Sequence, residues 1–158
     1  MGKVVIIMGS KSDVEHCKKV SKTLERFGVE CVLRIASAHE VPFKVLEILQ
    51  GCEKEEVVFI TVAGRSNALS GFVDANTIKP VIACPPYSDK FAGADIFSSL
   101  RMPSGVCPMV VLEPEQVALA AVKILTLSDE KLQEKIREYQ EEKRKEIERN
   151  DKETIQDG

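Results

Sequence analysis

The chain has 158 residues and a mass of 17.5 kDa, the size of one domain whose core can fold without metals or disulfides. Its 25 acidic and 22 basic residues give a net charge of −3, which argues against a protein that binds nucleic acid by neutralising phosphates. Aromatic residues make up only 5% of the chain and Trp is absent, so a base-stacking surface for single strands is also disfavoured.

The charge is unevenly distributed along the chain. Residues 129–158 contain eleven acids and eight bases and carry the whole net charge, whereas residues 1–128 are neutral. We therefore divide the chain into a neutral domain over residues 1–128 and a charged C-terminal helix and tail over residues 129–158. A narrow apolar stripe runs along this helix, at Leu132, Ile136, Tyr139 and Ile147. A stripe of this kind on an otherwise solvated helix is expected to dock, and we expect a neighbouring subunit to receive it.

The cysteine content indicates a reducing compartment. The five cysteines are an odd number and form no C-x-x-C pair, so reduced thiols in a cytoplasmic protein are expected. The apolar run near the N-terminus is too short for a signal peptide, and no stretch approaches the ~20 apolar residues of a membrane span. Neither His16 nor His39 has metal-ligand spacing from a cysteine, so no metal is expected.

Strand and helix patterns alternate along the first half of the chain. Val4–Met8 is a continuous apolar run, typical of a strand buried on both faces. Apolar residues at helical spacing between Val14 and Phe27 predict a helix that ends at Gly28, before a second strand over Val29–Ile35. A further helix is predicted from Pro42 to about Gly51.

The alternation continues in the second half. Strands are predicted at Val57–Val62, Val81–Cys84 and Met109–Leu112, and a last helix begins at Pro114 and runs to Leu127. Strands separated by helices imply parallel βαβ units. We therefore predict a three-layer α/β/α sandwich with a flavodoxin-like parallel sheet and an added charged C-terminal helix.

Polar or glycine-bearing loops follow four of the predicted strands. They are Gly9–Asp13, Ser37–His39, Ala63–Asn67 and Pro85–Tyr87. Because ligands bind outside the carboxyl ends of the strands in open parallel sheets, we expect these loops to converge on one crevice.

The loop Gly9–Asp13 has the chemistry of an anion site. Glycine allows close backbone approach, and the helix N-terminus and the hydroxyls of Ser10 and Ser12 supply hydrogen-bond donors. The loop is neither a Walker A motif nor a G-x-G-x-x-G fingerprint. Since the carboxylate of Asp13 would repel a phosphate, sugar hydroxyls suit it better, and the loop predicts a phosphorylated ribose. The alternative is a tight turn that only caps a helix.

Three further side chains each have a functional and a structural interpretation. His39, in a loop at the crevice mouth, is suited to moving a proton, but a lone histidine can also be structural. Arg65 is either an anion contact or an ordinary surface residue. Cys84 has no histidine near it in the sequence and lies at the end of an apolar strand, which favours an inert buried thiol. Residues 93–105 are rich in small and hydroxyl residues, which suits a short helix or a segment over a pocket.

Three motifs together resemble the PurE family, the phosphoribosylaminoimidazole carboxylases of purine biosynthesis. These are Met8–Asp13, Ser37–His39 and Pro85–Gly105, in the family's order and spacing, and the resemblance covers nearly the whole chain. One kind of member isomerises N5-carboxyaminoimidazole ribonucleotide; the other carboxylates 5-aminoimidazole ribonucleotide with CO2. The first kind has a Gly-Gly-Ala-Ala-His-Leu-like loop after the third strand, whereas residues 63–67 here read Ala-Gly-Arg-Ser-Asn. The chain therefore looks like the second kind, the class II carboxylases.

The resemblance implies roles for individual residues. Ser10, Ser12 and Ser37 would hold the phosphate, Asp13 would bind the ribose hydroxyls, and His39 matches the catalytic histidine. The complete substrate-binding set is Ser10, Ser12, Asp13, Ser37, Ala38, Ala63, Gly64, Arg65 and Ser66. Family members assemble as homo-oligomers, often octamers, so self-association is expected.

One position departs from the family pattern. Glu40 stands where the family usually has Arg or Lys, directly after the histidine, and its charge has the wrong sign for holding a phosphate. Either another cation compensates or the substrate differs from the usual one. The candidate cations are Lys11, Arg34, Arg65 and Arg101.

The resemblance implies a carboxy-lyase that needs no cofactor: no metal, biotin or ATP. The enamine-like C4 of the imidazole would attack CO2, and His39 would remove the C4 proton. Two alternatives remain open at this point: an N5-carboxyaminoimidazole ribonucleotide mutase, and a non-catalytic nucleotide- or flavin-binding module on the same scaffold.

Overall fold

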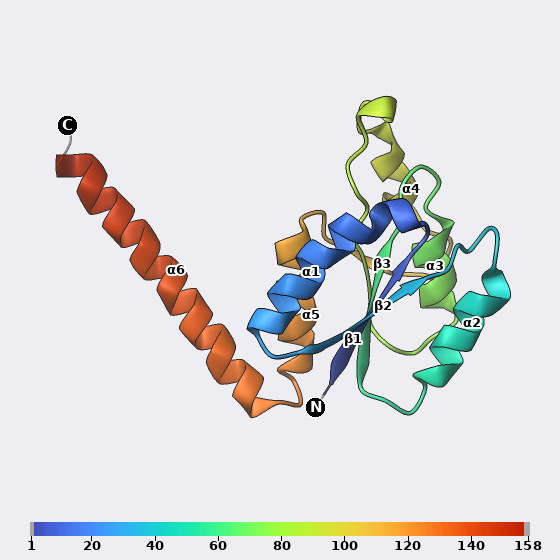
Figure 1. Ribbon diagram of the computed structural model, residues 1–158, viewed down its shortest axis with the longest axis horizontal. Helices are drawn as coiled ribbons and strands as arrows, with labels where there is room; N and C mark the ends of the chain where they lie inside the picture. The colour runs from blue at the N-terminus through green and yellow to red at the C-terminus, as the bar shows by residue number, and fades with distance from the viewer. Residues whose placement is uncertain (1, 157–158) are drawn as a thin grey trace.

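Five parallel strands form one sheet in the order β2-β1-β3-β4-β5, in a computed structural model that describes residues 2–156 (Figure 1). The strands are β1 (Lys3–Met8), β2 (Glu30–Ile35), β3 (Val57–Val62), β4 (Val81–Ala83) and β5 (Met109–Val110). This is the flavodoxin-like order, in which the direction of sheet growth reverses between β1 and β3. The predicted fold class is confirmed.

Helices cover both faces of the sheet. One face is covered by α1 (Val14–Arg26) and α5 (Pro114–Leu125), and the other by α2 (Pro42–Gly51) and α3 (Ala68–Ala75) (Figure 1). The remaining helices are the short α4 (Phe97–Leu100) and the long α6 (Glu130–Gln156). None of the helices described combines the length and the apolar composition that a membrane span requires.

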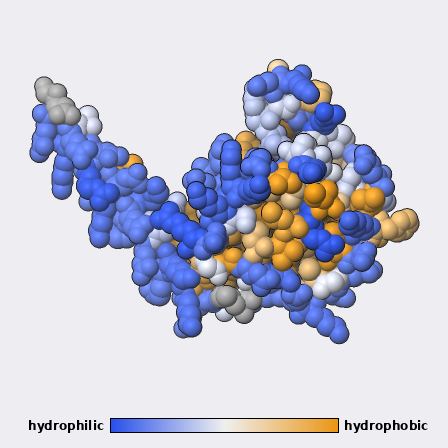
Figure 2. Space-filling view, in the orientation of Figure 1, coloured by the Kyte–Doolittle hydropathy of each residue, from blue (hydrophilic) through white to orange (hydrophobic). Residues whose placement is uncertain are grey.

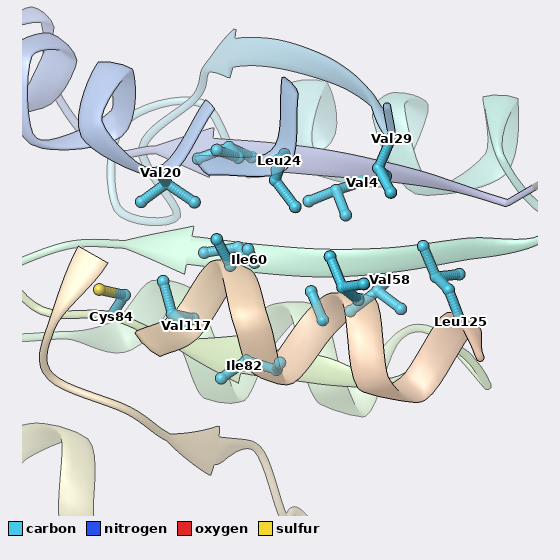
Figure 3. Close-up of a cluster of buried hydrophobic side chains, with 14 of the residues drawn as sticks. Val4, Val20, Leu24, Val29, Val58, Ile60, Ile82, Cys84, Val117 and Leu125 are labelled. Atoms are coloured by element: carbon cyan, nitrogen blue, oxygen red, sulfur yellow. The ribbon is translucent and has the colours of Figure 1, made fainter. Parts of the chain in front are cut away.

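The continuous apolar sequence of β1 is explained by its two buried faces. Side chains alternate along a strand, so Val4 and Ile6 pack toward α1 and α5, while Val5 and Ile7 pack toward α2 and α3. On the first face, Figure 3 shows residues of β3 beside residues of α1 and α5. The edge strand β2 is mostly exposed, and Figure 2 shows an apolar area on this face of the molecule. Exposed apolar side chains in β2 and at the start of α2 are Leu33, Ile35, Val41 and Phe43.

Several element boundaries differ from those predicted, and one helix was missed. Observed β2 begins at Glu30, β4 and β5 each end short of the predicted residue, and α5 ends at Leu125. Helix α3 follows directly on the loop of residues 63–67, where no helix was predicted. Its N-cap is Asn67, whose side chain accepts a hydrogen bond from the backbone N–H of Ser70. That capping residue before an apolar run was the available signal.

The apolar stripe of α6 is divided between two environments. Leu132 and Ile136 are buried in the core formed with α1 and α5, and the ring of Tyr139 packs edge-on against Phe27 at 5.5 Å between centroids. Beyond this contact α6 extends away from the body (Figure 1), and Ile147 is 68% exposed. The first turns of α6 therefore complete the core of their own chain. Docking of the remainder on a neighbouring subunit stays a prediction, as does self-association.

We expect Leu132→Ala to lower the free energy of unfolding by about 2–5 kcal/mol, because it empties a site in the core. Leu127→Ala removes the same atoms from a side chain that is 86% exposed, whereas Leu132 is 1% exposed. The control should change stability by less than ~0.5 kcal/mol. Urea unfolding at one fixed protein concentration measures both. Equal effects of the two substitutions would contradict the assignment of Leu132 to the core.

Candidate active site

A hollow of about 560 Å³ lies at the carboxyl edge of the sheet, at the switch between β1 and β3. All ten residues predicted for the site line it: Ser10, Ser12, Asp13, Ser37, Ala38, His39, Ala63, Gly64, Arg65 and Ser66. Pro86 and Tyr87, from the predicted loop after β4, line it as well. The four loops therefore converge as expected, because parallel strands deliver their carboxyl ends to one edge.

The first loop presents hydroxyl groups to the hollow. The Ser10 hydroxyl oxygen accepts hydrogen bonds from the backbone N–H of Ser12 at 3.2 Å and from the Ser12 hydroxyl at 3.0 Å. These contacts use the lone pairs of Ser10 and leave its own proton free to donate. The loop is held beside β3, since the Gly9 N–H donates to the Val62 carbonyl at 3.0 Å.

Asp13 stands at the N-terminus of α1 and lines the hollow. Ser10 caps the 3₁₀ turn Lys11–Asp13, and Asp13 occupies the N-cap position of α1 without a side-chain capping bond. Burial raises the pKa of the Asp13 carboxyl, although attraction to His16 opposes that rise. A hydrogen bond with the Ser10 backbone lowers this pKa as well. Because a carboxylate has several acceptor sites, Asp13 can still accept hydrogen bonds from ligand hydroxyls.

The second loop holds His39 at the edge of the hollow. Ser37 closes a turn around it: its hydroxyl oxygen accepts from the Glu40 N–H at 3.3 Å, and its carbonyl accepts from the Val41 N–H at 2.9 Å. His39 is exposed. Glu40 also lines the hollow.

The third loop contains a strained residue. Arg65 has φ of +59°, a conformation uncommon for a residue other than glycine. Its N–H donates to the Asp95 carboxylate at 3.0 Å, and its carbonyl accepts from the Ser98 hydroxyl at 3.1 Å. Among the described residues that line the hollow, Arg65 is the one Arg or Lys. Of the four cations considered for offsetting Glu40, it is therefore the one placed to do so.

Asp95 lines the hollow too, and sequence reasoning did not select it. It lies thirty residues after Arg65 in a different segment, between the 3₁₀ turn Asp89–Phe91 and α4. No motif marks it, and only the path of residues 86–100 over the carboxyl edge brings it to the site. That path supports the interpretation of this stretch as a segment lying over a pocket.

Cys84 has a histidine partner that the sequence did not reveal. The His16 Nε2 lies 3.3 Å from the Cys84 Sγ, although the two residues are 68 positions apart. Burial raises the pKa of the Cys84 thiol to about 12 and lowers the pKa of His16. The thiol is therefore protonated at neutral pH, which favours the interpretation as an inert buried residue over a nucleophile.

The parallel sheet and the polar hollow at its switch point define an α/β domain built to bind a small polar ligand at the carboxyl ends of its strands. Residues 3–146 match the AIR carboxylase family, AIRC. A phosphoribosylaminoimidazole carboxylase of Archaeoglobus fulgidus is 66% identical over 96% of this chain and 84% of its own length. One from Treponema denticola is 49% identical over 87% of this chain and 88% of its own.

Solved structures agree with the sequence comparison. A crystal structure of Treponema denticola PurE superposes with a TM-score of 0.94 at 46% identity, covering 97% of this chain and 98% of that one. A human bifunctional phosphoribosylaminoimidazole carboxylase/phosphoribosylaminoimidazole succinocarboxamide synthetase is 43% identical over 85% of this chain but only 32% of its own length. The chain belongs to the AIR carboxylase (PurE) family of purine biosynthesis.

Asp13→Asn should raise the free energy of unfolding at pH 7. Because burial raises the pKa of this carboxyl in the folded state, folding is penalised wherever the group must ionise. Below the pKa of the unfolded chain, about 3.9, the carboxyl is protonated in both the folded and the unfolded state, and the penalty is absent. Above the higher pKa of the folded state the carboxyl is ionised in both states, and the penalty is complete. The gain from Asn should therefore shrink as the pH falls toward 4. Urea unfolding at several pH values measures it.

Asp151→Asn is the matched control for this measurement, because Asp151 is exposed on α6. It should change stability by less than about 0.5 kcal/mol at every pH. A loss of stability in Asp13→Asn at pH 7 would mean that the Asp13 carboxylate makes a stabilising contact.

Proposed function

We propose that this chain carboxylates 5-aminoimidazole ribonucleotide with CO2 to give 4-carboxy-5-aminoimidazole ribonucleotide. The observation that carries this proposal is the gathering of serine hydroxyls, the Asp13 carboxylate, a histidine and an arginine around a single hollow. The names of the Archaeoglobus and Treponema relatives, both phosphoribosylaminoimidazole carboxylases, support it.

The nucleotide would be held by local donors. Ser10, Ser12 and Ser37 bind the phosphate through hydroxyl groups. Asp13 accepts hydrogen bonds from the ribose hydroxyls. Arg65 supplies the positive charge that offsets Glu40.

The reaction is a substitution at C4 of the imidazole. The electron pair of the C4–C5 enamine attacks the carbon of CO2, a C–C bond forms, and the CO2 oxygens take the negative charge. C4 is then tetrahedral and still carries its hydrogen. His39 removes that proton, and the C–H electrons restore the aromatic ring. In reverse, His39 protonates C4 and CO2 leaves. A positioned base of this kind contributes typically ~10²–10⁴-fold, and orientation of the two reactants adds to it.

The loop after β3 supports the carboxylase over the mutase. A mutase must release CO2 from its own substrate and hold it in the site. Family members of the mutase kind have a histidine-bearing loop after β3. This chain has Arg65, Ser66 and Asn67 at that place. A carboxylase takes CO2 from solution, so bicarbonate and CO2 should support its turnover.

The direct test offers the protein two substrates in parallel. We expect product from 5-aminoimidazole ribonucleotide plus bicarbonate, with a rate that rises with CO2 concentration. N5-carboxyaminoimidazole ribonucleotide should give product only as fast as it decarboxylates in buffer without protein. Absorbance of the carboxylated imidazole follows both reactions. Faster turnover of the N5-carboxy compound would identify a mutase, and tight binding without turnover in either assay would identify a non-catalytic module.

His39→Asn should lower kcat by about 10²–10⁴-fold, because asparagine keeps a polar side chain but cannot take a proton. Since His39 is exposed at the edge of the hollow, the substitution should leave the melting temperature unchanged and the affinity for 5-aminoimidazole ribonucleotide nearly so. Calorimetric titration of the nucleotide separates binding from catalysis. A variant that turns over at the parent rate would remove His39 from the proposed role.

A further inference from the structure

Residues 86–100 lie over the carboxyl edge of the sheet and are attached to the Arg65 loop by side-chain hydrogen bonds. Figure 1 shows this segment above the ends of the strands. Its attachment points are Asp95, Ser98 and Ser99, and all three bind residues between Arg65 and Asn67. Of these three, only Asp95 lines the hollow.

The Ser98 hydroxyl joins three backbone groups. It lies 3.1 Å from the Arg65 carbonyl and 2.8 Å from the Asp95 carbonyl, and it accepts from the Asn67 N–H at 3.0 Å. A hydroxyl has one proton and two lone pairs, so it accepts from Asn67 and donates to one carbonyl at a time. Ser98 thus holds both sides of the Arg65–Asn67 turn against its own segment.

A buried network of side-chain hydrogen bonds also holds the Arg65–Asn67 turn in place. The Asn67 side-chain amide donates to the Ser99 hydroxyl at 2.8 Å, and its oxygen accepts from the Ser70 N–H and hydroxyl at 3.1 and 2.9 Å. The Ser70 hydroxyl in turn lies 2.9 Å from the Thr61 hydroxyl in β3. The four side chains of this network are buried, and each has a hydrogen-bond partner. The network therefore favours a single conformation of the turn.

Arg65 is the residue that these contacts constrain. A φ of +59° is unfavourable for an arginine and persists only where the surroundings impose it. The surroundings here are the Asp95 carboxylate on its N–H and the Ser98 hydroxyl on its carbonyl. Loss of these contacts would free the backbone to adopt negative φ, and the Arg65 side chain would then leave the backbone in a different direction.

We propose that Ser98, with Asp95, is a positioning residue for Arg65 and thereby sets the affinity for the anionic substrate. The inference rests on the proposed function, since it takes the Arg65 guanidinium as a contact to that anion. Ser98 itself does not touch the substrate. Its loss affects binding more than proton transfer, because His39 belongs to a different loop.

The experiment uses Ser98→Val and Ser98→Thr, a pair with the same shape that differs only in the hydroxyl. Each is made in the parent and in Arg65→Ala, and KM and kcat for 5-aminoimidazole ribonucleotide are measured at saturating CO2. In the parent, Ser98→Val should raise KM by about 3- to 10-fold, the equivalent of one hydrogen bond, with a smaller change in kcat. Ser98→Thr should restore KM to near the parent value.

The double variant separates positioning from a structural role. In the Arg65→Ala background, Ser98→Val should change KM by less than ~2-fold, because the group it positions is gone. An equal rise of KM in both backgrounds would overturn the proposal, as would a Ser98→Thr variant as impaired as Ser98→Val. If Arg65→Ala leaves KM unchanged, the positioning proposal falls while the carboxylase assay still decides the function.

If Ser98→Val does not fold, a second pair of variants, at Asp95, tests the same proposal. Asp95→Asn retains a carbonyl oxygen that can accept from the Arg65 N–H, and Asp95→Ala does not. Asparagine should preserve KM to within ~2-fold and alanine should raise it. Equal impairment of both variants would assign Asp95 a charge role of its own in the hollow and would overturn its positioning role.

Discussion

The site depends on the burial of β1 and β3 as adjacent parallel strands with helices on both faces. Their register fixes Met8 beside Val62, so the loops that follow, beginning at Gly9 and Ala63, leave the sheet at the same level. From this pair the strand order continues to β2 on one side and to β4 and β5 on the other. The connections that follow β1 and β3 therefore diverge, and the hollow lies between them. The apolar residues that bury this pair therefore determine where the polar chemistry is placed, although none of them belongs to it.

Recognition in this hollow has to be local. Residues 1–128 are neutral overall, and the net charge of −3 belongs to residues 129–158. Most of α6, which lies within that range, extends away from the body (Figure 1). Asp13, Glu40 and Asp95 line the hollow together with one arginine, so no broad positive field attracts an anion. In the proposed function, hydroxyl groups, N–H groups and Arg65 would supply the affinity.

Helix α6 shows that a sequence boundary and a packing boundary need not coincide. Charge statistics separate residues 129–158 from the rest, yet Leu132 and Ile136 share a core with α1 and α5. Further contacts fasten the helix at its base: Lys135 donates to the Phe27 carbonyl at 2.7 Å, and Arg26 pairs with Glu142 at 2.9 Å. The first turns of α6 are part of the globular body, and only the distal part is free to serve another purpose.

The sequence by itself determined the strands, most of the helices and the loops that carry the ten site residues. A sheet that is buried on both faces requires continuous apolar runs, and each site loop begins where such a run ends. The sequence did not determine helix α3, the Asp95–Arg65 contact or the His16–Cys84 pair. Asp95 is thirty residues from Arg65, and His16 is 68 residues from Cys84, so no local pattern links either pair. These contacts exist only because the parallel crossovers bring distant segments to one edge, and that placement was decided by the tertiary structure.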